Sequence, residues 1–180
     1  MGSGTTLVEA KLLNRNAIGV DINPQSVSIS ETNLQFQCET KSKIHTRCAN
    51  ATDLSFIKDS HIDFICTHPP YANIIKYSKN VDGDISLLTV EEFLKEMTVV
   101  AQEAYRVLRK GKACAVMIGD MRRYGKVVPL GFWVMECFLS VGFVSKEIII
   151  KEQHNCRSTD YWEKQNNNFL LLAHEYIFVF

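Results

Sequence analysis

A short apolar segment that ends in two consecutive prolines constrains this sequence most. Residues Ile62 to Asn73 read I-D-F-I-C-T-H-P-P-Y-A-N, and the β-branched and aromatic residues at the start predict a buried strand. Pro69 and Pro70 have fixed φ angles and no N–H group, so no helix or sheet ladder uses up the carbonyls around them. Those carbonyls, the polar His68 and the aromatic Tyr71 suit a planar group whose NH₂ needs acceptors. The exocyclic amine of a nucleobase fits this description.

The chain opens with a glycine turn that leads into a helix, M-G-S-G-T-T-L-V-E-A-K-L-L. Gly2 and Gly4 permit the turn, and Thr5 can cap the helix. The next strand, A-I-G-V, ends in Asp21. An acidic residue at a strand tip, about 20 residues after a glycine turn, is placed to hydrogen-bond a ribose diol. Leu7 stands where a dinucleotide fingerprint has its third glycine, which favours a nucleoside without phosphates.

Both segments resemble those of one enzyme family. T-H-P-P-Y resembles the catalytic tetrapeptide of S-adenosylmethionine-dependent DNA amino-methyltransferases acting on adenine N6 or cytosine N4, written Asp/Asn/Ser-Pro-Pro-Tyr/Phe/Trp, with His68 as a departure. G-S-G-T-T-L-V-E-A and G-V-D-I-N-P resemble the cofactor loop and the following acidic strand. The resemblance implies an α/β fold: a Rossmann-like methyltransferase sheet with helices on both faces and a C-terminal antiparallel hairpin. It implies one catalytic domain over 1–180, and no stretch of the sequence resembles a target-recognition domain.

The resemblance also implies a cofactor, S-adenosyl-L-methionine. The matching cofactor-binding residues are Gly2, Ser3, Gly4, Thr5 and Asp21. The segment R-C-A-N-A-T-D-L is similar to one whose polar side chain contacts the cofactor adenine, so Asn50, or alternatively Asp53, is expected in that role. The simpler alternative is a solvated turn with Asp53 as a helix cap.

The same resemblance assigns catalysis to His68, Pro69, Pro70 and Tyr71. His68 and the Pro69 carbonyl would accept from the target NH₂ and draw its lone pair towards the methyl group, and Tyr71 would stack on a flipped base. In the alternative arrangement, His68 donates to a ring nitrogen and the carbonyls accept. A neutral imidazole accepts only through its unprotonated nitrogen, so activity is expected to fall as the pH drops through the ordinary histidine pKa of about 6.5.

Charge gives a local, not a global, indication of a nucleic-acid partner. The 20 basic and 20 acidic residues cancel, so a polyanion must be met by a local patch or by another polypeptide. Candidate DNA contacts are Asn73 and Lys76 in the loop after the prolines, and Arg122, Arg123 and Lys126 in a basic turn. Solvated surface is the simpler interpretation of the loop, whereas phosphate contact and solvated surface explain the basic turn equally well.

In the resembled family, the cofactor loop follows a strand and an aspartate that would lie upstream of Met1. Three explanations are open: a fragment, a second polypeptide that donates the first parallel strand and target recognition, or a circular relative. Two other functions are also open, namely an RNA or tRNA amino-methyltransferase and a non-catalytic subunit. The sequence contains no apolar run of membrane-spanning length and its six cysteines have no metal-site spacing, so we expect a cytoplasmic protein without a bound metal.

Periodicity and capping residues predict the remaining elements. We expect helices over 25–36, from Thr89 to the segment R-K-G-K, and over 129–141, and strands over 17–20, 43–48, 62–67, 113–118, 143–151 and 169–180.

Overall fold

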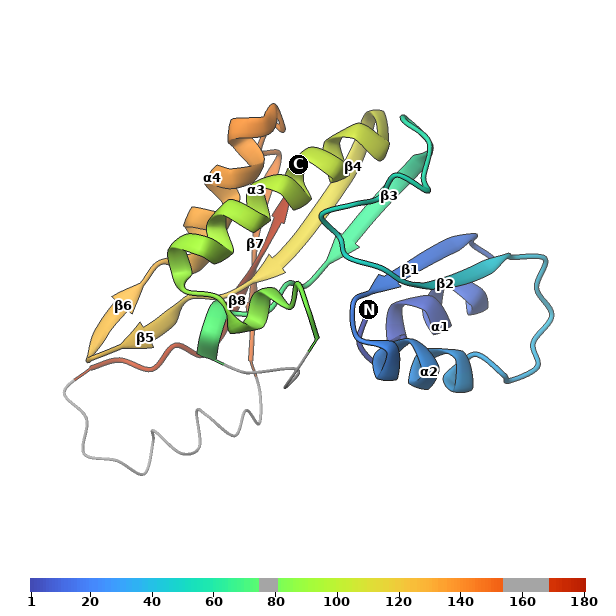
Figure 1. The fold of residues 1–180 in the computed structure, drawn as a ribbon, viewed down its shortest axis with the longest axis horizontal. Helices are drawn as coiled ribbons and strands as arrows, with labels where there is room; N and C mark the ends of the chain where they lie inside the picture. Colours follow the sequence, from blue (N-terminus) through green and yellow to red (C-terminus); the bar gives the residue numbers. More distant parts are fainter. Residues whose placement is uncertain (75–80, 154–168) are drawn as a thin grey trace. The chain divides into compact units, whose positions relative to one another are not determined.

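The computed structural model describes residues 1–74, 81–153 and 169–180, which divide into two compact units (Figure 1). The N-terminal unit comprises residues 1–56 and 81–84, and the C-terminal unit comprises residues 57–74, 85–153 and 169–180. Each unit has its own sheet and its own helices. That both belong to one catalytic domain stays a prediction.

Two helices and two parallel strands form the N-terminal unit. Their order is α1 (Thr5–Leu12), β1 (Ala17–Asp21), α2 (Pro24–Asn33) and β2 (Ile44–Cys48). Asp21 at the end of β1 lies opposite Cys48 at the end of β2, and Leu7 of α1 and Val27 of α2 are buried. All four elements were predicted, although α2 ends earlier than expected. Because the strands are parallel, the loops that follow them leave the same edge of the sheet.

The C-terminal unit contains a mixed four-stranded sheet. Its strands are β3 (Ile62–Thr67), β4 (Leu108–Ile118), β7 (Glu147–Glu152) and β8 (His174–Val179), in the spatial order β3-β4-β8-β7. β3 and β4 are parallel, whereas β8 is antiparallel to both β4 and β7. The predicted C-terminal antiparallel hairpin is therefore confirmed, with shorter strands than expected.

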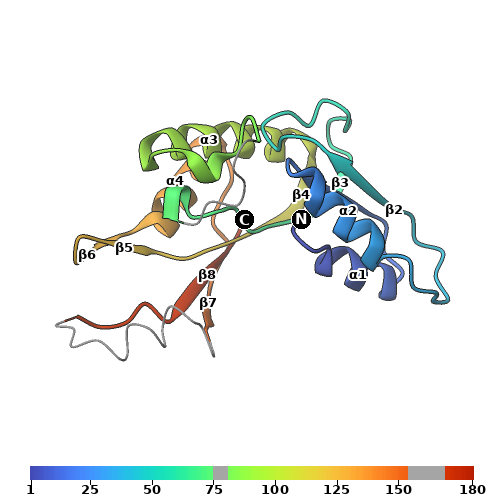
Figure 2. The same cartoon turned by 60° about the horizontal axis from the view of Figure 1, so that its bottom comes forward.

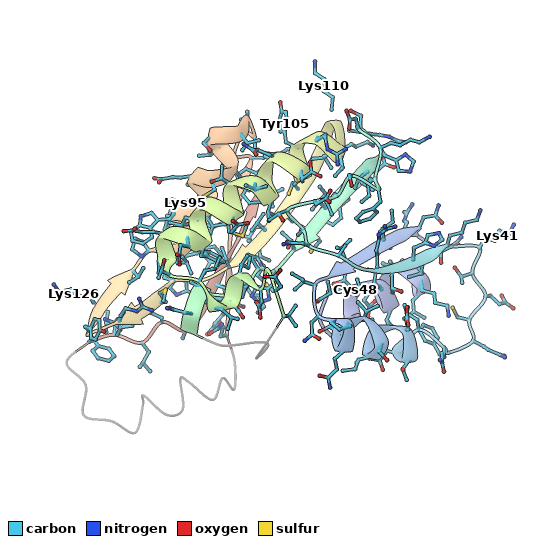
Figure 3. All side chains as sticks on the ribbon, in the orientation of Figure 1. Lys41, Cys48, Lys95, Tyr105, Lys110 and Lys126 are labelled. Atoms are coloured by element: carbon cyan, nitrogen blue, oxygen red, sulfur yellow. The ribbon has the colours of Figure 1, made fainter. Side chains whose placement is uncertain are left out.

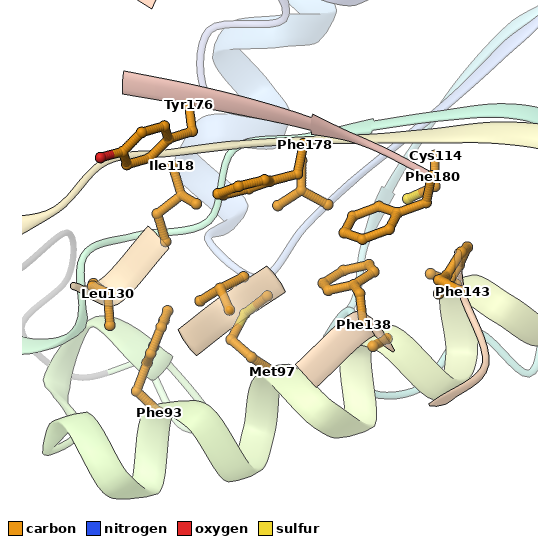
Figure 4. Close-up of a cluster of buried hydrophobic side chains, with 14 of the residues drawn as sticks. Phe93, Met97, Cys114, Ile118, Leu130, Phe138, Phe143, Tyr176, Phe178 and Phe180 are labelled. Carbon is orange, nitrogen blue, oxygen red and sulfur yellow. The ribbon is translucent and has the colours of Figure 1, made fainter. Parts of the chain in front are cut away.

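Two helices, α3 (Val90–Val107) and α4 (Leu130–Val141), lie on the same side of this sheet in both views (Figures 1 and 2). The side chain of Thr89 caps α3 by accepting from the Glu92 N–H, and the Glu92 carboxylate accepts from the Thr89 N–H. Figure 4 shows the core between the helices and β8, where Phe138 of α4 stacks on Phe180 at 5.3 Å between ring centroids. This core anchors β8, which carries a residue of the site described below.

The boundary between α3 and β4 differs from the prediction. The helix ends at Val107 and β4 begins at once with Leu108, whereas the basic segment R-K-G-K was expected to end the helix. The physical reason is a partner across the sheet, since Asp63 of β3 accepts a hydrogen bond from Arg109 at 2.9 Å and lies 3.6 Å from the Lys112 ammonium group. The basic side chains pair with a neighbouring strand and do not cap a helix.

A short hairpin was missed by the sequence analysis. β5 (Met121–Arg123) and β6 (Lys126–Val128) flank a two-residue loop, Tyr124 and Gly125, in which both residues have positive φ. Such a loop favours asparagine and glycine, and Tyr124 is an uncommon residue for it. The sequence R-Y-G-K therefore gave only a turn signal. Two single-turn helices, η1 (Ala72–Ile74) and η2 (Ile85–Leu87), complete the described elements.

Candidate active site

The glycine turn of the N-terminal unit is held by α2. Gly4 precedes α1 with φ of 82°, and a Cβ atom there would lie 2.8 Å from the Cβ of Ser30. The Ser30 hydroxyl donates to the carbonyl of Gly2, and the Asn33 amide donates to the carbonyl of Ser3. Gly4 is thus required by both conformation and space. Thr5 is the first residue of α1 and is exposed.

Asp21, at the end of β1, lies against this turn. Its Oδ2 accepts from the Gly2 N–H and from the amino group of Met1, both at 3.0 Å, and its Oδ1 accepts from the Asn23 N–H at 2.9 Å. Burial would raise the pKa of Asp21, but these hydrogen bonds outweigh burial and lower it below its ordinary value. The carboxylate is therefore ionised at neutral pH and accepts hydrogen bonds only.

Asn50 and Asp53 follow β2 at the same edge of the sheet, where Ala49 donates its N–H to the carbonyl of Asp21. Asn50 accepts from the Thr52 N–H at 3.1 Å, and Asp53 accepts from the Ser55 N–H at 2.9 Å. In Figure 3, the labelled Cys48 marks this end of β2. The structure thus brings Asn50 close in the fold to Asp21, and Asp53 lies one turn further along the chain.

The corner after β3 belongs to the C-terminal unit. β3 ends at Thr67, Pro69 is buried, and the His68 side chain is 42% exposed. Ala72, which follows Tyr71, is fully buried with φ of 45°. Positive φ is uncommon outside glycine and occurs often at functional sites, where the surrounding structure holds it in place.

A buried carboxylate that the sequence analysis did not identify joins this corner. Glu175 of β8 is 5% exposed, and its Oε1 accepts a 2.6 Å hydrogen bond from the Tyr71 hydroxyl. The same Oε1 lies 3.4 Å from Nε2 of His68, and Oε2 accepts from the Lys151 ammonium group at 2.6 Å. The Tyr71 hydroxyl also accepts from the Gly119 N–H at 3.0 Å. We call His68, Tyr71, Lys151 and Glu175 the corner network.

The protonation states in the corner network follow from burial and charge. Burial is the main cause that lowers the pKa of His68 and Lys151 adds to it, while the opposing attraction to Glu175 is weaker. Burial would raise the pKa of Glu175, but hydrogen bonds from Lys151 and Tyr71 lower it. At neutral pH the network therefore holds a neutral imidazole beside an ionised carboxylate.

Most of the predicted DNA contacts already have partners within the C-terminal unit. Arg123 donates a short hydrogen bond to the side chain of Asn73. Arg122 donates hydrogen bonds to the carbonyls of Gly125 and Leu170, and its guanidinium group lies over the ring of Phe169. Lys126 is exposed, at the end of the β5–β6 hairpin (Figure 3). Lys76 lies outside the described residues. Phosphate contact by any of these residues stays a prediction.

Solved structures with a similar fold include methyltransferases. An S-adenosylmethionine-dependent methyltransferase from Methanosarcina mazei is 16% identical with a TM-score of 0.60, over 99% of this chain and 87% of that one. The cytosine-N4-specific PvuII DNA methyltransferase is 15% identical with a TM-score of 0.58, over 73% of this chain and 46% of that one. The chain therefore has the predicted Rossmann-like α/β fold of S-adenosylmethionine-dependent methyltransferases.

A third similar structure is that of a Thermus thermophilus protein assigned as a DNA modification methylase and crystallised with S-adenosyl-L-methionine. It is 24% identical with a TM-score of 0.53, and the match covers 73% of this chain and 52% of that one. The chain thus spans about half the length of this relative. No curated protein matches the chain. Among the described residues, no helix is long and apolar enough to cross a membrane.

The sequence profile of one family, described as DNA methylase, matches residues 1–32 and 62–180. The matched segments include the glycine turn, Asp21, the corner after β3 and the whole C-terminal sheet. The chain belongs to this DNA methylase family.

Proposed function

We propose that this protein transfers a methyl group from S-adenosyl-L-methionine to the exocyclic amine of a DNA base, adenine N6 or cytosine N4. The observation that carries the proposal is the corner network, in which a neutral His68 stands beside the buried Pro69 at the end of β3. Family membership supports DNA as the polymer.

The N-terminal unit fits the cofactor. Gly2, Ser3, Gly4 and Thr5 would hold it along the turn, and Asp21 would bind its ribose. Three of the roughly four lone-pair sites on the Asp21 carboxylate are already used, which leaves Oδ1 able to accept from one hydroxyl. Asn50, or alternatively Asp53, would contact the adenine. When bound, the cofactor supplies an electrophilic methyl group on a sulfonium.

The residues of the corner would position the amine. An exocyclic amine is a poor nucleophile because its lone pair is delocalised into the ring. His68 and the Pro69 carbonyl would accept its hydrogens, and Pro70 would keep the carbonyl row rigid. Tyr71 would offer its ring face to the base, with the ring held by hydrogen bonds to Glu175 and Gly119. We propose that both units act as one catalytic domain.

A further strand would complete the sheets. Among residues 1–74, 81–153 and 169–180, β3 pairs only with β4 and β1 only with β2. Open edges of this kind are uncommon without a cover. We propose that an additional segment, from a longer chain or a second polypeptide, pairs with β3. Hydrogen exchange checks this, since the outer amides of β3 should exchange fast in this chain alone; slow exchange would contradict an open edge.

The test of function is methyl transfer from labelled S-adenosyl-L-methionine to duplex DNA and to tRNA, followed by identification of the modified nucleoside. We expect label in DNA as N6-methyladenine or N4-methylcytosine. His68→Ala should lower the rate by about 10²-fold, the scale of removing one polar contact to the reacting group. Glu147→Gln, an exposed change in β7, serves as the control and should have no effect.

Two outcomes would contradict the proposal. Label in tRNA but not in DNA would assign the protein to RNA. Absence of label together with absence of binding heat for S-adenosyl-L-methionine would favour a non-catalytic subunit.

A further inference from the structure

The corner network contains a carboxylate with no counterpart in the motif that led to the site. Glu175 is separated from Tyr71 by 104 positions in the chain, yet it contacts both polar side chains of the corner. It is almost fully buried. A buried carboxylate is costly unless it is paired and hydrogen-bonded, and Glu175 meets this condition through Lys151, its cross-strand partner in β7.

The arrangement determines which nitrogen of His68 carries the proton. The ionised Glu175 can only accept hydrogen bonds, and the imidazole atom that faces it is Nε2. At 3.4 Å this contact is longer than a normal N–H···O hydrogen bond. Its electrostatic preference is still for a proton on Nε2. In the neutral ring, Nδ1 then holds the free lone pair.

Partial burial of the ring, with a smaller contribution from Lys151, keeps the carboxylate from turning His68 into a cation. Glu175 alone would favour the imidazolium, which has no lone pair to accept with. The Lys151 ammonium group, 2.6 Å from the other carboxylate oxygen, weakens that attraction. Among the described residues of the C-terminal unit, the charged and titratable groups that act on His68 are Glu175 from β8, Lys151 from β7 and Tyr71 from the corner itself.

We infer that Glu175 is a positioning residue, which sets the Nε2–H tautomer of His68 and the ring orientation of Tyr71 so that Nδ1 of His68 is the acceptor for the target amine. The inference rests on the proposed function. It selects the accepting role for His68 over the alternative in which His68 donates to a ring nitrogen. The recognised group is an amine on a planar base.

Glu175→Gln tests the inference with little change in volume. The amide NH₂ of glutamine can donate to Nε2, which favours the opposite tautomer with the proton on Nδ1. We expect kcat to fall about 100-fold, within the range for a correctly placed protonatable group, while KM for DNA and the binding heat for S-adenosyl-L-methionine stay unchanged. Glu147→Gln, the same chemical change at an exposed position of β7, should leave all three values as in the wild type.

Nitrogen NMR of the His68 ring gives a readout that a structural role would not move, and it does not require activity. The wild type should show protonated Nε2 and unprotonated Nδ1 at pH 8, and Glu175→Gln should show a shift towards Nδ1–H. A wild-type ring with the proton on Nδ1 would overturn the inference, as would a Glu175→Gln variant with unchanged kcat. If Glu175→Gln does not fold, the tautomer of His68 in the wild type tests the inference by itself.

These results separate the inference from the proposed function. A wild type that methylates DNA but carries the His68 proton on Nδ1 refutes the inference and leaves the proposed function intact. A wild type that methylates neither DNA nor tRNA refutes the proposed function, and the NMR result still tests the link between Glu175 and His68.

Discussion

Removing the hydroxyl of Tyr71 should weaken the C-terminal unit measurably. In Tyr71→Phe the ring stays, but Glu175 loses a 2.6 Å hydrogen bond and the Gly119 N–H loses its acceptor. A hydrogen bond to a charged group contributes about 1.5–3 kcal/mol, and an unsatisfied buried donor costs about 1–3 kcal/mol. Tyr71 is only half-buried and water can restore part of both, so we expect a loss of about 2–3 kcal/mol in the free energy of unfolding.

Tyr105→Phe is the matched control for this change. Tyr105 lies in α3, is 51% exposed, and packs its ring edge-on against Phe143 at 5.1 Å, a contact that phenylalanine keeps (Figure 3). Its unfolding free energy should stay within about 0.5 kcal/mol of the wild type, as for an ordinary surface change.

Urea unfolding followed by circular dichroism measures the free energy of unfolding of both variants. The near-ultraviolet signal from the aromatic core reports on the C-terminal unit. Equal midpoints for Tyr71→Phe and Tyr105→Phe would refute the reasoning, because the hydroxyl of Tyr71 would then contribute nothing. Methyl transfer by Tyr71→Phe should fall without being abolished, since the ring face remains but loses the hydroxyl contacts with Glu175 and Gly119 that orient it.

Three further predictions concern the titration of His68, the cofactor and DNA. Because partial burial lowers the pKa of His68, the acid limb of kcat should lie below pH 6.5 and should vanish in His68→Asn. A limb at or above pH 6.5 would contradict a ring that is neutral because it is partly shielded from solvent. Asp21→Ala should weaken S-adenosyl-L-methionine binding about 10-fold in calorimetry, the loss of one charge-assisted hydrogen bond, and an unchanged binding constant would remove Asp21 from the cofactor site. Lys126→Ala should reduce the salt dependence of DNA binding by about one phosphate contact. Lys95→Ala, an exposed change in α3, should leave the salt dependence unchanged. Equal slopes of the binding constant against salt concentration for the two variants would show that the hairpin does not touch DNA.

Local signals in the sequence were sufficient for the elements that carry the motifs. The residues of β3 and the prolines after it predicted a strand and a rigid corner, and the capping box at Thr89 predicted the start of α3. The strand was expected to be buried, which is wrong for the described residues, since none of β3 is buried and it pairs there only with β4. The glycine turn and Asp21 were predicted to belong to one cofactor site, and the Gly2 N–H donates to the Asp21 carboxylate 19 positions away. The strand, the corner and the helix start depend on residues close in sequence.

Features that depend on distant partners were not predictable in the same way. The basic residues after Val107 read as a helix end because their partner, Asp63, lies in another strand. Glu175 gave a weak signal, the single acidic residue of the mainly apolar β8, and nothing in its neighbourhood along the chain indicated that it would meet Tyr71. Its role depends on which strands become neighbours, and that is a property of the whole sheet.

The pairing of His68 with Glu175 has a consequence for how this site can vary. The resembled family often has an aspartate where this chain has His68, and an aspartate here would bring a second negative charge close to the carboxylate of Glu175. Two carboxylates close together repel, so one would take up a proton. Reverting position 68 to the family residue should therefore fail alone and succeed better when Glu175 becomes glutamine at the same time. The residues at positions 68 and 175 are therefore expected to change together during evolution.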